Sequence, residues 1–169
     1  MPGRRAPIAE EQIEELRQQH IGRLLLRAQR DFSDRAIEKL SARGHTGLSL
    51  AHTNIIVHID SAGTRLSTLA DRAGVSKQAI GNLVIDLEHK GYIARTPDTA
   101  DRRATLISLT EAGWQFLRDA HQVKREIEAE YRDRLGEAGM RSLRDLLALL
   151  LTDSSRAIGG PDREEEPPT

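Results

Sequence analysis

Residues 66–83 read Leu66-Ser67-Thr68-Leu69-Ala70-Asp71-Arg72-Ala73-Gly74-Val75-Ser76-Lys77-Gln78-Ala79-Ile80-Gly81-Asn82-Leu83. Two short helices are predicted, over residues 66–73 and 76–90, because Ser76 is a good cap that follows a break at Gly74. A helix-turn-helix needs a small residue at the closest approach of its helices, here Ala70, and a turn residue that tolerates positive φ, here Gly74. Three apolar side chains fill the angle between the helices: Val75, Ile80 and Leu83. The segment predicts a helix-turn-helix, and the alternative is an ordinary corner between two helices.

A β-hairpin is predicted directly after these helices. Residues 92–95 and 105–109 have strand-type composition, and the polar residues 96–103 between them suit a hairpin with a long tip. A helix-turn-helix followed by such a hairpin, the wing, is a winged helix. Its second helix enters the major groove of DNA, and its wing reaches the backbone or the minor groove. The hairpin therefore favours a DNA-reading unit over an ordinary helical corner.

Long helices are predicted on both sides of this unit. Apolar residues spaced three and four apart predict one helix over residues 8–40, followed by a glycine-containing loop over 41–47. A further helix begins near Ser49, which can cap it, and ends at a break over 61–63. After Thr110 a helix resumes, and one stripe of it is expected to face the core: Trp114, Leu117, His121, Lys124, Ile127, Tyr131 and Leu135.

The first and last helices predict a homodimer. A helix of roughly 30 residues outruns an ordinary compact domain and usually finds a partner. After a break marked by Gly136 and Gly139, the last helix, over residues 140–151, carries leucine on more than one face. Such a helix is buried from several sides, which places it at the dimer interface.

These elements predict a mainly α fold with a small β-hairpin wing, a winged helix-turn-helix plus a helical dimerisation domain. Along the chain we expect an N-terminal arm over residues 1–9, a helical dimerisation domain over 10–47 and 114–153, a winged helix-turn-helix DNA-binding domain over 48–113, and a disordered acidic tail over 154–169. The tail combines glycines, prolines and three consecutive glutamates, a composition that cannot bury enough apolar surface to fold.

Composition excludes several kinds of chemistry. The 169 residues include no cysteine, which removes disulfides, thiolate metal sites, a catalytic thiol and a thiol redox switch. No apolar segment is long enough for a signal peptide or a membrane span, so a cytoplasmic protein is expected. The formal net charge is -1, so nucleic-acid binding has to rest on local charge, and residues 63–110 hold seven basic and five acidic residues.

No enzyme, cofactor or metal site is predicted. The chain has no glycine-rich phosphate loop, no nucleophile elbow and no zinc-protease motif. No two of its six histidines stand three or four residues apart on one predicted helix, the spacing that a helical metal site needs. They are therefore interpreted as scattered surface or boundary residues: His20, His45, His52, His58, His89 and His121.

Four segments resemble the MarR family of bacterial transcription regulators: residues 48–56, 69–80, 87–93 and 97–113. The most specific motif is Asp-Arg-Arg-Ala before a strand that ends Leu-Thr-Glu-Ala-Gly, and the resemblance spans about residues 13–151. It implies a homodimer whose first and last helices interlock and whose two winged lobes bind double-stranded DNA at a pseudo-palindromic operator. It further implies a repressor that leaves DNA when a small-molecule effector binds between the dimerisation helices and the winged helix.

The resemblance assigns nine residues to the DNA-binding site: Arg65, Ser76, Lys77, Gln78, Asn82, Arg95, Asp101, Arg102 and Arg103. Those on the second helix would read bases, since glutamine and asparagine pair with adenine, lysine with guanine or a phosphate, and serine with either. The two wing arginines would enter the minor groove, with Asp101 holding Arg103 in position. Arg65 and Arg95 are candidate phosphate contacts.

The family's layout also places His20 and His52 at the effector cleft, and Trp114 is a further candidate, as an aromatic platform on which an effector could stack. Of these, Trp114 is explained more simply as a core residue on an apolar stripe. The alternative to a DNA-binding regulator is a winged-helix module that binds protein. Arg102 and Arg103 at the hairpin tip favour DNA, because a protein-binding wing more often exposes apolar residues.

Overall fold

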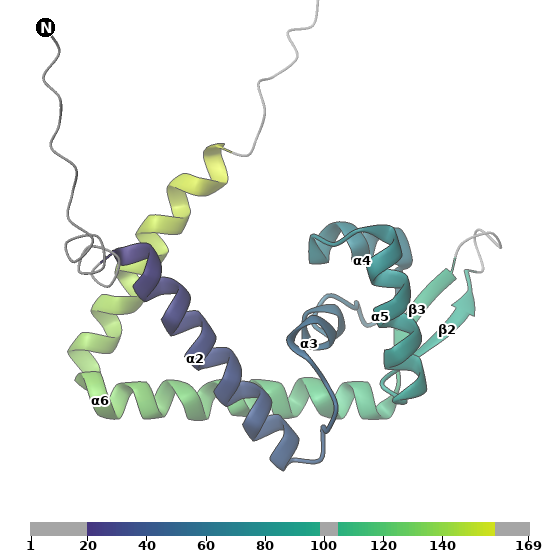
Figure 1. Cartoon of the computed structure of the whole chain (residues 1–169), viewed down its shortest axis with the longest axis horizontal. Coiled ribbons are helices and arrows are strands. Elements are labelled where there is room, and N and C mark those ends of the chain that lie inside the picture. Colours follow the sequence, from purple (N-terminus) through teal and green to yellow (C-terminus); the bar gives the residue numbers. More distant parts are fainter. Residues whose placement is uncertain (1–19, 99–104, 158–169) are drawn as a thin grey trace, which may run out of the picture. The chain divides into compact units, whose positions relative to one another are not determined.

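The computed structural model describes residues 20–98 and 105–157 (Figure 1). Its elements are α2 (Ile21–Ala42), α3 (Leu50–Ile56), β1 (Thr64–Arg65), α4 (Leu66–Ala73), α5 (Lys77–His89), β2 (Ile93–Pro97), β3 (Thr105–Leu109) and α6 (Glu111–Ala157). The chain forms two compact units, Met1–Ile127 and Glu128–Thr169, and α6 contributes to both. The predicted fold class, mainly helical with a small hairpin, is confirmed. The predicted arm, the start of the first predicted helix and the end of the tail lie outside the described residues.

The helix-turn-helix forms as the sequence predicts. α4 ends at Gly74, which adopts the left-handed conformation (φ 65°, ψ 32°) that lets the chain turn. α5 starts after Ser76, whose hydroxyl oxygen accepts a hydrogen bond from the backbone N–H of Ala79 at 3.2 Å. Ala70 and Ile80 are buried, so the two helices pack together at the predicted small residue.

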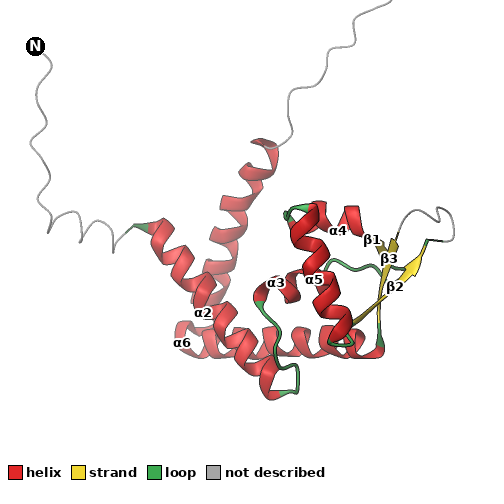
Figure 2. Ribbon diagram, turned by 45° about the vertical axis from the view of Figure 1, so that its right-hand side comes forward, coloured by secondary structure: helices red, strands yellow, loops and turns green. Residues whose placement is uncertain are grey.

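The wing is the hairpin of β2 and β3, and it belongs to a three-stranded sheet in the order β1-β3-β2 (Figure 2). β3 pairs antiparallel with both neighbours: Ile93 lies opposite Leu109, and Thr64 lies opposite Ile107. The sequence prediction lacks β1, because two residues are too few to show a strand period. Through β1, the segment that leads into α4 is bonded to the wing.

The turn into α6 explains the motif Leu109-Thr110-Glu111-Ala112-Gly113. The hydroxyl of Thr110 donates to the carbonyl oxygen of Gly91 at 2.6 Å and accepts from the backbone N–H of Gly113 at 3.2 Å. A Cβ atom at Gly113 would overlap the carbonyl oxygen of Tyr92. A glycine is therefore needed where α6 passes the base of the wing.

Four of the five buried positions on the first part of α6 lie one residue before the predicted stripe. Of that stripe only Ile127 is buried; Trp114 and Leu117 are half-buried, and His121 and Lys124 are exposed. The residues that α6 buries are Gly113, Phe116, Ala120, Val123 and Ile127. The prediction is wrong because glycine and alanine add little hydrophobic signal, although close packing needs small residues at such positions.

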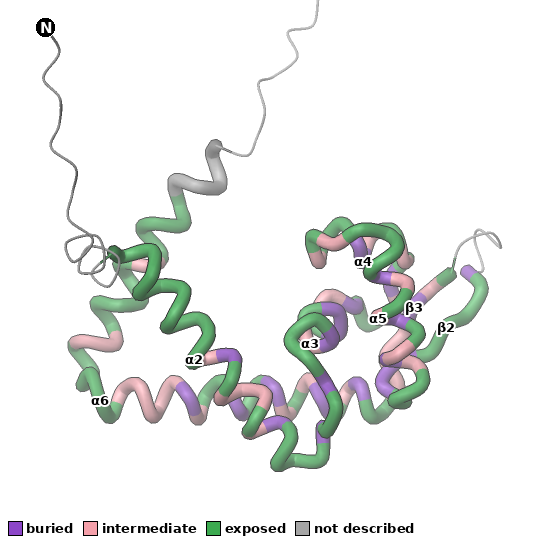
Figure 3. The backbone as a smooth tube through the Cα atoms, in the orientation of Figure 1, coloured by how far each residue is buried: buried purple, intermediate pink, exposed green. Residues whose placement is uncertain are grey.

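Both terminal helices expose apolar side chains. These are Ile21, Leu24, Leu25 and Leu26 on α2, and Leu143, Leu146, Leu149, Leu150 and Leu151 in the second unit. Buried positions gather instead on α3, α5 and the first part of α6 (Figure 3). Gly136 takes a non-helical conformation (φ 70°, ψ 166°), which confirms the predicted break there, whereas Gly139 lies within a helix. A membrane span would need a longer apolar run than any described helix has.

Candidate DNA-binding surface and adjoining pocket

α5 brings four predicted DNA contacts onto one exposed surface. Its inner face is held by Ile80, Val84 and Leu87, which are at most 1% exposed. All four predicted contacts are exposed: Ser76, Lys77, Gln78 and Asn82. Hydroxyl, ammonium and amide groups on the first two turns of an exposed helix are the groups that reach base edges in the major groove. The surface thus has the composition of a base-reading helix.

Arg65, a predicted phosphate contact, forms an ion pair with Asp98. Its Nε and Nη2 atoms lie 2.8 and 2.7 Å from Oδ2 of Asp98. The Asp98 side chain is buried, while that of Arg65 is 47% exposed. Asp98 is the last described residue before the wing tip, so this pair fixes the end of β2 to the start of α4.

Arg95, the second predicted phosphate contact, links the wing to α5. Its Nε lies 2.7 Å from Oε2 of Glu88, and this hydrogen bond lowers the pKa of the Glu88 carboxyl and raises the pKa of the Arg95 guanidinium. A guanidinium has five N–H donors, so an arginine paired in this way can still bind a phosphate. The remaining residues of the predicted DNA-binding site, Asp101, Arg102 and Arg103, lie outside the described residues.

His52, predicted to face an effector cleft, joins α3 to α5 instead. The ring is buried, and its Nδ1 accepts a hydrogen bond from the backbone N–H of Ser49 at 3.0 Å, which completes a capping box at the start of α3. In a neutral imidazole only the other nitrogen then carries a proton, and this Nε2 donates to Oδ2 of Asp86 at 2.9 Å. Lys90 lies 3.3 Å from the other oxygen of Asp86. His52 therefore connects α3 to α5, the helix that carries the predicted base contacts.

An apolar pocket of about 520 Å³ lies between α2, α3 and the first part of α6. Its apolar lining includes Phe32, Ile37, Leu40, Phe116 and Val123. Its polar lining consists of Gln29, Ser33, Thr53, Asn54 and Lys124. A concave, mainly apolar site of this size with a few polar groups suits a small molecule.

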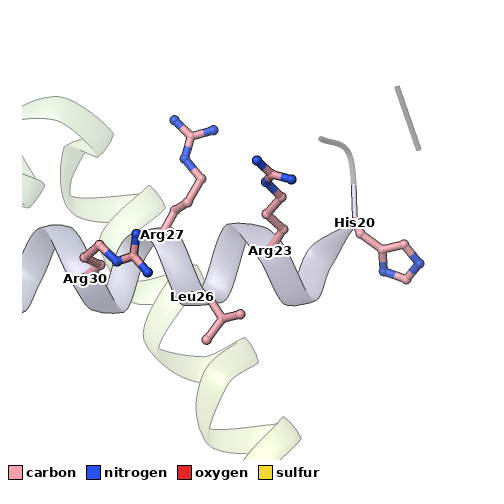
Figure 4. Close-up of a pocket in the computed structure, with 5 residues that line it drawn as sticks. All are labelled: His20, Arg23, Leu26, Arg27 and Arg30. Carbon is pink, nitrogen blue, oxygen red and sulfur yellow. The ribbon is translucent and has the colours of Figure 1, made fainter. Parts of the chain in front are cut away.

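The three residues predicted at the effector cleft do not line this pocket. His20 lies at the N-terminal end of α2, beside an open depression on that helix (Figure 4). The depression is lined by His20, Arg23, Leu26, Arg27 and Arg30. Trp114 is half-buried on α6. The effector-binding role predicted for these three residues therefore stays a prediction.

His45, interpreted from the sequence as a surface or boundary residue, is buried and connects three parts of the fold. Its Nδ1 lies 3.1 Å from the hydroxyl of Tyr92 at the base of the wing, and its Nε2 lies 3.0 Å from Oδ2 of Asp119 on α6. The ring also packs edge-on against Phe116. Burial raises the pKa of the Tyr92 hydroxyl, and hydrogen bonds from Gln115 and His45 lower the pKa of Asp119.

Known proteins that are similar to this chain identify its family. A family model described as MarR family matches residues 46–104, which contain α3, α4, α5 and β2. The HTH-type transcriptional repressor MdtR of Bacillus subtilis (strain 168) is 30% identical over 104 residues, which are 61% of this chain and 67% of MdtR. The chain belongs to the MarR family. This MarR-family protein is thus a transcriptional regulator with a winged-helix DNA-binding fold.

A solved structure extends the likeness to most of the MarR-family chain. The crystal structure of CouR from Rhodococcus jostii RHA1, bound to p-coumaroyl-CoA, has a TM-score of 0.63 and 26% identity, covering 86% of this chain and 97% of CouR. A riboflavin kinase of Thermoplasma acidophilum is 41% identical over 51 residues, but these are 30% of this chain and 22% of the kinase. The likeness to the kinase is therefore confined to one short segment.

The sequence analysis assigned no role to two acidic residues of this MarR-family surface, Asp98 and Asp86. Asp98 binds Arg65, while the predicted pairing of Asp101 with Arg103 lies outside the described residues. Asp86 of α5 binds His52 of α3. The partners of the first pair stand 33 residues apart, and local spacing carries no signal for contacts over such separations.

Proposed function

We propose that this MarR-family regulator is a homodimeric repressor that binds a pseudo-palindromic operator and is released from it by a small-molecule effector. The observation that carries the proposal is the exposed surface of α5. There Lys77, Gln78 and Asn82 stand together, next to a wing that Arg65 and Arg95 attach to the helices. Side chains that pair with base edges and cations that reach phosphates are the two components of sequence-specific binding.

Dimerisation is proposed because the terminal helices expose apolar surface that a monomer would leave in water. The five exposed leucines between residues 143 and 151 are 40% to 66% exposed, and Leu26 on α2 is 68% exposed. A contiguous exposed apolar patch marks an interaction surface. In a two-fold dimer the two base-reading helices would meet successive major grooves, about 34–36 Å apart, which makes the operator a pair of half-sites.

The pocket between α2, α3 and α6 is proposed as the effector site. Leu50, Ala51 and Thr53 of α3 line it, and His52 on the same helix binds Asp86 of α5. A ligand that displaces α3 therefore acts on α5 through a direct contact, and a lobe that moves no longer matches the spacing of the grooves. That CouR is seen bound to p-coumaroyl-CoA supports a ligand-responsive role.

Selection from random duplexes, followed by fluorescence anisotropy, tests the proposed DNA binding. We expect the full chain to enrich a two-fold symmetric motif and to bind it more tightly than an unrelated duplex at every salt concentration. The logarithm of affinity should fall with the logarithm of salt by about 0.9 for each phosphate contacted. Failure to enrich any motif, with equal weak binding to all duplexes, would contradict the proposal and favour the protein-binding alternative.

A further inference from the structure

α5 exposes a row of side chains that continues beyond the predicted base contacts. Gln78, Asn82, Ile85 and His89 are all exposed. They form one stripe, because residues three and four apart on an α-helix face the same way. Ile85 is 42% exposed, whereas the other large apolar residues of α5, a helix that is described throughout, are buried or half-buried. A polar row thus contains one outward-facing apolar side chain.

The acidic residues that flank Ile85 are each paired with a cation. Oδ1 of Asp86 lies 3.3 Å from Nζ of Lys90, and Oε2 of Glu88 lies 2.7 Å from Nε of Arg95. Unpaired carboxylates at these positions would repel the phosphates that border a groove. Because both are compensated, the second half of α5 can approach DNA with Ile85 in front.

We propose that Ile85 reads a thymine of the operator by packing on its C5-methyl group. This inference rests on the proposed function, since it requires α5 to lie in the major groove. The thymine methyl is the apolar group that base pairs present there. A single exposed isoleucine elsewhere on the surface would need no explanation, but here it interrupts the row that carries Gln78 and Asn82. Seven residues separate Ile85 from Gln78, about 10.5 Å along the helix, so the two side chains read different base pairs.

Removing one methyl group from the DNA tests this inference. In the selected duplex, each thymine of both half-sites is replaced in turn by uracil, which pairs with adenine in the same way but lacks the methyl. For the wild-type protein we expect uracil at one position to weaken binding by about fourfold per half-site, the effect of one buried methyl group. Ile85→Ala should bind the thymine and uracil forms of that position equally. Ile85→Val should retain part of the difference.

Asn82→Ala is the matched control on the same face of α5. It should weaken operator binding but keep the difference between thymine and uracil at the Ile85 position. Folding of Ile85→Ala is checked by its thermal unfolding curve, since an exposed alanine favours a helix. The inference is overturned if wild-type protein binds its selected duplex specifically but tolerates uracil everywhere, or if Ile85→Ala shows the same loss. Failure to select any duplex would instead overturn the proposed function and the role of Ile85 with it.

Discussion

Replacing Asp98 by asparagine tests whether its ion pair with Arg65 holds the wing in the position that DNA binding needs. Arg65 approaches Oδ2 of Asp98 with two nitrogen atoms, at 2.8 and 2.7 Å, and the side chains are 11% exposed for Asp98 and 47% for Arg65. Hydrogen bonds to charged groups contribute about 1.5–3 kcal/mol, and solvent around the arginine reduces this to about 1–2 kcal/mol. A wing that must hold this position to touch DNA then costs the Asp98→Asn variant roughly 5–30-fold in specific affinity.

The same substitution removes a negative charge close to the DNA, and that change alone raises affinity. Anisotropy with the selected duplex and an unrelated duplex separates the two effects: for Asp98→Asn we expect weaker specific binding and slightly stronger non-specific binding. Asp71→Asn is the control, because Asp71 is exposed on α4 and its carboxylate has no ion pair among the described residues. It should strengthen binding to both duplexes. If Asp98→Asn behaves like Asp71→Asn, the wing is not held by this pair and the reasoning is refuted.

Three further predictions concern stability and assembly. Gly113→Ala should lower the free energy of unfolding, measured in urea, by about 1–3 kcal/mol, because the added Cβ meets the carbonyl oxygen of Tyr92 at the base of the wing. Gly81→Ala is the control: the added Cβ lies in open space on α5, so this variant should raise the free energy of unfolding by about 0.5–1 kcal/mol. Shifts of both variants in one direction would exclude that contact as the cause. Side-chain hydrogen bonds, the largest from Gln115, lower the pKa of Asp119. The stability that these hydrogen bonds contribute is present above the ordinary pKa of 3.8 and is lost as the pH falls through the lower folded-state pKa. Asp119→Asn should therefore flatten the acid side of the curve of unfolding free energy against pH. An unchanged curve would count against this pairing. Leu146→Lys should move the sedimentation coefficient from dimer toward monomer at micromolar concentration, since a charge cannot be buried unpaired in an apolar interface; an unaffected dimer would place the interface elsewhere.

The turn between α4 and α5 was predictable because each of its requirements is local. Gly74 supplies the left-handed turn, Ser76 caps the next helix, and Ala70 allows the close approach, all within a few residues. The face of α6 was not predictable in this way. On that helix two stripes of residues have helical spacing, and either could face the core. Which of them is buried depends on the carbonyl oxygen of Tyr92, because the space beside it at Gly113 admits only a hydrogen atom in place of a side chain.

The candidate site shows the same division between local and distant causes. Lys77 and Gln78 could be placed on the surface because they follow a cap and precede the apolar positions of α5. His52 could not be placed, because a polar residue that faces a cleft and one that binds a neighbouring helix have the same local spacing. Its position is decided by Asp86, which the fold brings to 2.9 Å.

The ion pairs also bear on how an effector would act. Arg65 joins the start of α4 to the wing through Asp98, and Arg95 joins the wing to α5 through Glu88. The pair of His52 with Asp86 joins α5 to α3 in the same manner. Distorting the winged unit internally means breaking these pairs, whereas moving it as a whole breaks none of them. The proposed effector pocket touches this block at α3, so an occupant acts on the entire lobe. Operator release would then follow from the spacing between two intact lobes rather than from a change in the shape of either.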